Sequence, residues 1–395
     1  MFRKYWRDNF LSRPQLHTFI NVLEDVSIQR SDWTCNGSRR LQKMEMNRMK
    51  LLNFCRVTAA SMAIAVAGLG AASNAAAETV LRLSHTTAEK MNQGSQAWAV
   101  IFKEMVERNS DQQIKVQIQG ANAAGSEREQ LQKAQTGINQ MTINSEILMP
   151  SFFKPAQVWG IPYLFNSDAV AWEVLDGEFG DAFNEAWREA TGLRILGVFN
   201  AGVRSFFNAK RPVHGPSDLK GLKIRTGENQ GHIAMVRALG GNPVPIAWSE
   251  LYTSLQQGVV DGMENPPGLA YAMKLHEHQK YLTLDRHLFS IHVAMINDDV
   301  YQSLTPEQQN IVQEAARTAT VVARATVLLD ERDAIEELRE AGIEIYAPTA
   351  EEYAEYRDLG RPPVEEMVRK DIGDEWVDKM LAGISTAEAK VGQGQ

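Results

Sequence analysis

Histidine and carboxylate side chains are the groups of this chain that could catalyse a reaction or bind a metal ion. Their spacing argues against most arrangements of either kind. His276 and His278 could chelate a metal ion, but they lie beside Glu277 and Lys274 in a polar helical stretch, which favours a solvated surface. The sequence contains no G-x-S-x-G elbow, Walker A loop or H-E-x-x-H pair. No motif brings together a nucleophile, a base and an orienting group, so the sequence predicts neither catalysis nor a metal or cofactor site.

Polar side chains follow two predicted strands. Residues 79–84 and 140–144 each have the short, β-rich pattern of a strand, and a polar pair or triplet comes directly after each. Loops at the carboxyl ends of strands line ligand clefts in open α/β sheets. The candidate ligand contacts from this pattern are His85, Thr86, Thr87, Ser145 and Glu146.

The elements that must position these residues alternate between strands and helices. Strand–helix–strand–helix–strand order over residues 79–144 is typical of an α/β layer with a largely parallel sheet. A second α/β unit is predicted over residues 202–289. Its expected strands are 221–225 and 259–262, and its helices are 232–239 and 249–257. Further strands are predicted at 193–199 and 290–296, and helices at 305–339, 351–360 and 363–383. We therefore expect two α/β lobes followed by C-terminal helices.

A hydrophobic stretch near the start of the chain has the features of an export signal. Val57–Ala72 contains no charge, follows basic residues, and precedes an Ala-x-Ala site at 75–77. A transmembrane anchor is the weaker alternative, because a span needs about 20 strongly apolar residues. We expect residues 1–77 to be an N-terminal extension and signal peptide. Translation would begin between Met44 and Met49, and cleavage would occur before Glu78.

Charge and cysteine content narrow the possible functions. The 395-residue chain is 44% hydrophobic and 23% charged, as in a globular protein, with a net charge of −8. Residues 78–395 contain 30 basic and 44 acidic side chains, which argues against a general nucleic-acid binder. Both cysteines, Cys35 and Cys55, precede residue 78. Cysteine nucleophiles, disulfides and cysteine zinc sites are therefore excluded from the mature protein.

The stretch from residue 202 to residue 267 is the most specific part of the sequence. It reads Gly202-Val-Arg204-Ser-Phe-Phe-Asn208, then Pro216-Ser-Asp-Leu-Lys-Gly-Leu-Lys-Ile-Arg225, Pro245-Ile-Ala-Trp248-Ser-Glu250 and Asp261-Gly-Met-Glu264-Asn265-Pro266. With Gly160-Ile-Pro-Tyr-Leu164 and the long helix after Thr305, this pattern resembles the substrate-binding proteins of TRAP transporters (tripartite ATP-independent periplasmic transporters) of the DctP type. The resemblance extends from about Thr79 to the C-terminus.

This resemblance implies a two-lobed periplasmic-binding-protein-like fold that closes on an organic acid. Arg225 matches the arginine that forms a salt bridge with the ligand carboxylate, which suits a planar guanidinium. Arg204, Asn265 and Trp248 match further ligand-contacting positions. The alternatives are a surface position for Arg225, structural roles for Arg204 and Asn265, and a core position for Trp248.

The resemblance also implies an organisation and partners. Lobe I would comprise residues 78–201 and lobe II residues 202–289, with residues 290–330 returning to lobe I and residues 331–395 packing on lobe II. The partners would be an organic acid and the small and large membrane subunits, in the periplasm, and a monomer is favoured over a dimer. Dicarboxylates, keto acids, hydroxy acids, sugar acids and amino-acid-like anions all remain open. Two other functions remain open: a secreted enzyme using His85 or Glu146 as acid or base, and a sensory binding protein.

Overall fold

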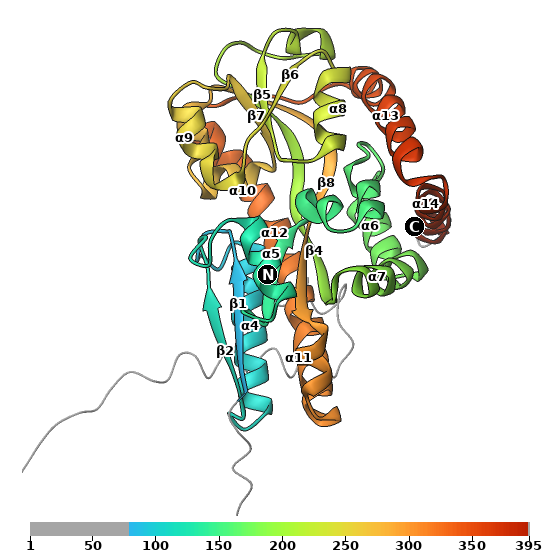
Figure 1. Cartoon of the computed structure of the whole chain (residues 1–395). Coiled ribbons are helices and arrows are strands. Elements are labelled where there is room, and N and C mark those ends of the chain that lie inside the picture. Colours follow the sequence, from blue (N-terminus) through green and yellow to red (C-terminus); the bar gives the residue numbers. More distant parts are fainter. Residues whose placement is uncertain (1–78, 394–395) are drawn as a thin grey trace, which may run out of the picture. The chain divides into compact units, whose positions relative to one another are not determined.

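The computed structural model describes residues 79–393, all within the second of two compact units, Asn74–Gln395. Figure 1 shows these residues in colour. The predicted start codon, signal peptide and cleavage site lie outside the described residues. Within the described part, no helix is both long and apolar enough to cross a membrane.

Strands and helices alternate along most of the described chain. The strands are β1 Thr79–His85, β2 Ile114–Gln119, β3 Met141–Ser145, β4 Leu193–Asn208, β5 Lys223–Thr226, β6 Asn242–Pro245, β7 Gly262–Asn265, β8 Tyr281–Asn297 and β9 Glu344–Tyr346. The α-helices are α4 Gly94–Asn109, α5 Glu127–Gln135, α6 Asp168–Leu175, α7 Glu178–Thr191, α8 Gln230–Ala238, α9 Leu251–Gln256, α10 Pro267–Ala272, α11 Asp298–Ser303, α12 Pro306–Glu340, α13 Ala350–Ile372 and α14 Glu375–Gln393. Short 3₁₀ helices are η1 Glu146–Ser151, η2 Lys154–Gly160, η3 Pro216–Leu219, η4 Trp248–Glu250 and η5 Leu275–His278.

The strands of the described chain form one mixed sheet in the order β2-β1-β3-β8-β4-β7-β5-β6, with β9 paired to β8. β1 is parallel to β2 and β3, and β5 is parallel to β6 and β7. β8 runs antiparallel to both β3 and β4. The α/β prediction is confirmed, but parallel pairing is limited to the two end groups and the short β8–β9 pair, and the long central strands pair antiparallel.

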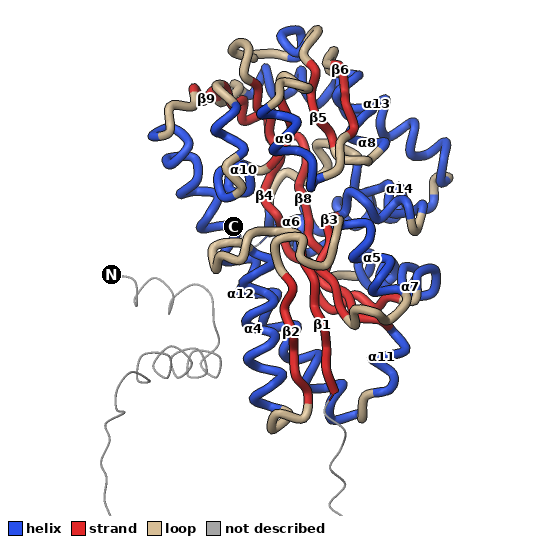
Figure 2. Tube along the Cα trace, turned by 60° about the vertical axis from the view of Figure 1, so that its left-hand side comes forward, coloured by secondary structure: helices blue, strands red, loops and turns tan. Residues whose placement is uncertain are grey.

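Two long antiparallel strands join the two parallel groups (Figures 1 and 2). β4 has 16 residues and β8 has 17, whereas the sequence predicted only residues 193–199 and 290–296. The β4–β8 register shifts at three places, one of them between Asn200 and Gly202. Such bulges interrupt the alternation on which strand prediction depends. The sequence pattern therefore underestimated both strands.

The predicted long helix is confirmed and runs along the joining strands. α12 has 35 residues, and Thr305 forms a capping box with Gln308 at its start, with proline in the first turn. The helix packs against α4 and β4. It therefore supports the segment of the sheet that connects the two ends.

Two other predictions were wrong in detail. The strand expected at residues 259–262 lies later, as β7, because a short apolar run does not fix the bounds of a buried strand. The break expected between residues 360 and 363 is absent, since α13 continues through Pro362 and Pro363. A Cβ on Gly360 would lie 3.3 Å from Tyr163 and 3.4 Å from Leu239, so tertiary packing holds this helix against its neighbours.

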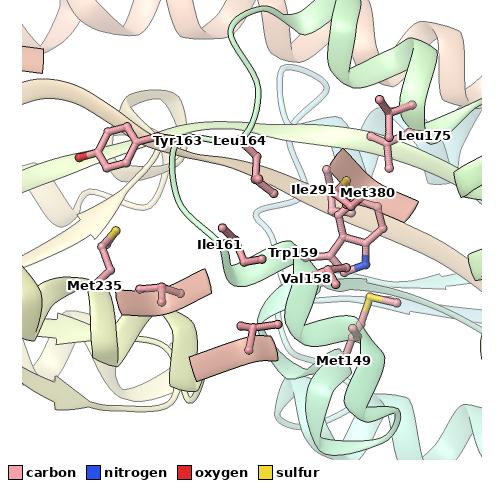
Figure 3. Packing of buried hydrophobic residues seen from close by; sticks show 14 of the residues in the cluster. Met149, Val158, Trp159, Ile161, Tyr163, Leu164, Leu175, Met235, Ile291 and Met380 are labelled. Carbon is pink, nitrogen blue, oxygen red and sulfur yellow. The ribbon is translucent and has the colours of Figure 1, made fainter. Parts of the chain in front are cut away.

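The largest buried apolar cluster fixes the segment after η2. Trp159, Ile161 and Tyr163 are buried in this cluster together with Met235 of α8 and Met380 of α14, and Figure 3 shows these side chains spread along the segment. α13 packs on α8, and α14 packs on α6. The C-terminal helices thus contact both α6, which precedes β4, and α8, which follows β5.

Candidate functional site

A cavity lies where residues from both ends of the sheet meet. Its volume is about 140 Å³, which is large enough for several water molecules or a small organic molecule. Seven of the nine residues predicted for the site line this cavity. These residues are Thr86, Thr87, Ser145, Arg204, Arg225, Trp248 and Asn265. The tertiary structure therefore brings together side chains that are up to 179 positions apart in the sequence.

Arg225 is a buried cation on the cavity wall, held by β5. Its Nε and Nη2 donate hydrogen bonds to the carbonyl oxygen of Ile246 at 2.9 and 2.7 Å, while Nη1 has no partner among the described residues. No carboxylate of the described chain lies within 4.0 Å of the guanidinium. Burial lowers the pKa of Arg225 to about 10, so the group stays charged at neutral pH. The side chain is thus oriented by the backbone and left without a counter-charge.

Arg204 of β4 differs from Arg225 because it is already paired. Its guanidinium donates to the Glu264 side chain and backbone carbonyl, and to Asn265 Oδ1 at 3.2 Å. Burial alone would raise the pKa of Glu264, but the charge of Arg204, together with His232 and the hydrogen bonds from His232 and His287, holds that pKa well below its usual range. Arg204 and Glu264 therefore form a buried ion pair that also orients Asn265.

A chain of alternating charges continues behind this ion pair. His287 lies between Glu264 at 3.4 Å and Asp285 at 2.8 Å, and Asp285 accepts a hydrogen bond from the Tyr163 hydroxyl at 3.1 Å. Burial alone would lower the pKa of His287, but the two carboxylates raise it to about 9. The network fixes β4, β7 and β8 against the segment that carries Tyr163.

The opposite wall of the cavity is polar and carries little positive charge. The Ser145 amide at the end of β3 donates to Glu127 Oε1 at 2.6 Å, and the Ser145 hydroxyl has no partner among the described residues. His292 of β8 lies opposite Ser145 in the sheet, with Nδ1 2.9 Å from Ser95 Oγ. Burial lowers the pKa of His292 to about 3, so the imidazole is neutral.

Two helices begin at the cavity. Ser126 is the N-cap of α5, and Asn229 is the N-cap of α8, directly after the lining residues Gly227 and Glu228. The amino terminus of a helix carries a partial positive charge and unpaired N–H groups. Both helices therefore add positive potential to the site.

The mouth of the cavity is crossed by one ion pair. Arg128 of α5 and Glu228 lie 3.7 Å apart, and both side chains are about half exposed. The Trp248 ring lies beside Arg225, with 6.0 Å between the guanidinium carbon and the ring centroid. The Arg128–Glu228 pair therefore joins the two ends of the sheet, whereas Trp248 and Arg225 belong to the same end.

His85 and Glu146, the other two predicted residues, are placed behind the cavity wall and not in its lining. His85 is buried, with Nε2 2.8 Å from Gln96 Oε1 and Nδ1 3.3 Å from Thr87 Oγ1. Glu146 is buried and accepts hydrogen bonds from Ser290 Oγ and the Ile291 amide; burial raises its pKa to about 7. Each side chain orients residues of the wall.

The histidine pair singled out in the sequence packs against two aromatic rings. The His276 ring stacks on Tyr271 and the His278 ring packs on Tyr252, and both are partly buried instead of fully solvated. Within residues 79–393, no group of three or more His, Cys, Asp or Glu side chains could hold a metal ion.

Several lining residues were missed by the sequence reasoning, chiefly Glu127, Arg128, Glu228, Ser290 and His292. The S-x-x-E pattern at Ser126 predicts the start of a helix, and this signal was available. Nothing in the sequence indicates that this helix end faces Arg225. His292 was also hidden, because its strand is buried on both faces and lacks alternation.

Comparisons with known proteins agree with this geometry. The family model DctP, described as bacterial extracellular solute-binding protein, family 7, matches residues 83–371. A solute-binding protein of Verminephrobacter eiseniae is 35% identical over 271 residues, which is 69% of this chain and 80% of that protein.

Solved structures extend the comparison to the fold. The sugar acid binding protein DctPAm from Advenella mimigardefordensis, in complex with galactonate, has a TM-score of 0.74 at 27% identity and covers 78% of this chain and 98% of its own. A TRAP periplasmic solute binding protein from Polaromonas sp. JS666, bound to D-erythronate, has a TM-score of 0.72 at 30% identity and covers 77% and 99%. The chain therefore belongs to the DctP family, family 7 of the bacterial extracellular solute-binding proteins.

Proposed function

We propose that this solute-binding protein captures a small organic acid through Arg225 and delivers it to a TRAP membrane permease. The observation that carries the proposal is the unpartnered Nη1 of a buried, charged Arg225 on the cavity wall. A carboxylate satisfies this group because its two oxygens accept parallel hydrogen bonds from a guanidinium. Such charge-assisted hydrogen bonds each contribute about 1.5–3 kcal/mol.

The remaining lining residues would orient the ligand. In this proposal Asn265, held by Arg204, offers amide groups to the ligand, and Trp248 covers its side. Thr86 and Ser145 offer hydroxyls, while His85 and Glu146 hold the neighbouring lining residues Thr87 and Ser290 from behind. Contacts of these kinds explain why a cavity with one strong anchor can still distinguish between acids.

We further propose that the two lobes close around the ligand by bending at β4 and β8. Lobe I would comprise residues 78–201 and 290–330, and lobe II residues 202–289, with residues 331–395 covering them. The Arg128–Glu228 pair across the mouth is the contact that closure would form. The solved relative from Polaromonas is described as periplasmic. Export of this protein, with cleavage of the signal peptide before Glu78, would place it in the periplasm, where we propose that it acts as a monomer.

Catalysis has no geometric support in the described residues. An enzyme using His85 or Glu146 as acid or base needs these groups at the ligand, and neither lines the cavity. A sensory role would use the same site and a different membrane partner. Recovery of the bound acid unchanged after denaturation would separate a receptor from an enzyme.

The test is thermal unfolding of the purified protein against a panel of organic acids. Ligand binding to the folded state adds about 2.7 kcal/mol of stability at a hundredfold excess over Kd. We expect stabilisation by one class of acid and its loss in Arg225→Met. Arg317→Met, which changes an exposed arginine of α12, should behave like wild type. Stabilisation that survives in Arg225→Met would overturn the role of Arg225.

A further inference from the structure

We infer that this cavity selects a hydroxylated monocarboxylate over the dicarboxylate of the same length, and that Glu127 enforces the choice. The inference rests on the proposed function, since it assumes that Arg225 binds a carboxylate. It goes further by assigning the chemistry of the ligand's other end.

The first argument is the balance of charges around the cavity. Three arginines line it, and two already have a carboxylate partner: Arg204 is paired with Glu264, and Arg128 faces Glu228 at 3.7 Å. Among the described residues, only Arg225 of the three has none. Arg225 is thus the cavity arginine of the described chain with no carboxylate in direct contact, although the charges of Glu264 and Glu127 act on it, and it can pair with one ligand carboxylate.

The second argument is the composition of the wall on which a second carboxylate would lie. Glu127 lines the cavity and is held there by the Ser145 amide at 2.6 Å. Burial raises the pKa of Glu127, and the charges of Arg225 and Arg204 oppose that rise. A second ligand carboxylate would lie beside this partly buried carboxyl group, and two carboxylates that share a site repel each other.

The third argument is that the same wall suits hydroxyl groups. The Ser145 hydroxyl is buried and unpartnered among the described residues. His292 is neutral, its Nδ1 is taken by Ser95, and its Nε2 makes no hydrogen bond within residues 79–393. A hydroxyl can donate to Glu127 and either donate to or accept from Ser145 and His292, whereas a carboxylate can only accept. The wall thus matches a hydroxylated chain ending in CH2OH.

The test uses pairs of acids that differ only in the terminal carbon. D-Galactonate and galactarate form one pair, and D-erythronate and meso-tartrate form the other; in each pair CH2OH is replaced by a carboxylate. Isothermal titration calorimetry on the purified full chain gives Kd for each acid. We expect wild type to prefer the monocarboxylate by at least tenfold in at least one pair.

Glu127→Gln is the informative variant, because glutamine is isosteric and its oxygen can still accept the Ser145 amide hydrogen bond. We expect the preference ratio to fall at least fivefold, mainly through tighter dicarboxylate binding. Glu104→Gln, which removes an exposed glutamate of α4, is the matched control and should leave the ratio unchanged.

The outcomes separate the two proposals. Wild type that binds none of these four acids would overturn this inference, and the proposed function falls with it only if no acid of the wider thermal-unfolding panel stabilises the protein. Equal or tighter binding of the dicarboxylates by wild type would overturn the selectivity alone. A ratio that is unchanged in Glu127→Gln would remove Glu127 as its cause. If the variant does not fold, the wild-type ratio still decides the selectivity.

Discussion

Arg204 and Arg225 are both buried arginines of one cavity, yet their energetic situations are opposite. The side chain of Arg204 neutralises Glu264, whereas no carboxylate of the described chain neutralises Arg225. Removing one partner of a buried ion pair leaves an uncompensated charge, while removing a lone buried charge relieves a desolvation penalty. Arg204 therefore contributes to stability, and Arg225 is retained for binding at some cost to stability.

This contrast predicts the stability of two matched variants without ligand. Arg204→Met should lower the free energy of unfolding by up to about 3–5 kcal/mol, because the buried Glu264 loses its arginine partner and keeps only the contacts with His232 and His287 at 3.3 and 3.4 Å. Arg225→Met should be as stable as wild type or more stable. Urea denaturation of both variants measures the difference. A larger loss in Arg225→Met than in Arg204→Met would contradict the assignment of the ion pair.

Among the elements, β4 contains a backbone position, Gly202, that favours glycine. Gly202 has a φ of +106°, and a Cβ there would lie 2.5 Å from Glu331 Oε1 and 2.6 Å from a side-chain carbon of Pro266. The Glu331 carboxylate of α12 also accepts the hydrogen bond of the Val203 amide at 2.6 Å. The strand, α12 and the turn before α10 therefore meet at one glycine, between the two ends of the sheet.

We expect Gly202→Ala to destabilise the protein more than Gly192→Ala. Gly192 also has a positive φ, +71°, but open space surrounds its missing Cβ. Strain at a left-handed position costs about 1–3 kcal/mol, and the crowding at Gly202 adds to that cost. The two midpoints of thermal unfolding give the comparison. Equal losses would show that β4 and α12 are less tightly packed than described.

The elements also show how far prediction from sequence could reach. The helix expected at 305–339 is confirmed because its cap and its length are local properties. The bounds of β4, β7 and β8 were misjudged because bulges and burial on both faces remove alternation. Seven of the nine predicted site residues line the cavity, mainly because strand ends converge in such folds. Their contacts with ligand remain a prediction.

At the scale of the whole molecule, the buried charge network makes stability depend on pH. His287 has its pKa raised to about 9 in the folded protein by Asp285 and Glu264, against an ordinary value of 6.5. The folded state therefore holds this proton more tightly than the unfolded chain does. The resulting stabilisation is complete below pH 6.5 and is lost as the pH rises through 9.

Between pH 7 and pH 9, the free energy of unfolding should therefore fall by on the order of 2–3 kcal/mol. His287→Gln should be less stable at pH 7 and should show a flatter decline. His214→Gln, at an exposed histidine, should keep the wild-type slope. Chemical denaturation across this range measures both slopes. A wild-type slope retained in His287→Gln would place the titrating group elsewhere.

The sequence by itself determined the class of protein, the α/β architecture, the long capped helix and the arginine expected to anchor a ligand. These follow from local patterns and from a family resemblance carried by short motifs. Only the tertiary structure decided which arginine has no carboxylate partner among the described residues. Arg204 finds its carboxylate 60 residues away and Arg225 finds none, because pairing depends on which strands become neighbours. The tertiary structure likewise placed Glu127 and His292 in the cavity. The position of Glu127 depends on how the start of α5 packs, and that of His292 depends on the register of β8 against β3. No local sequence pattern encodes either.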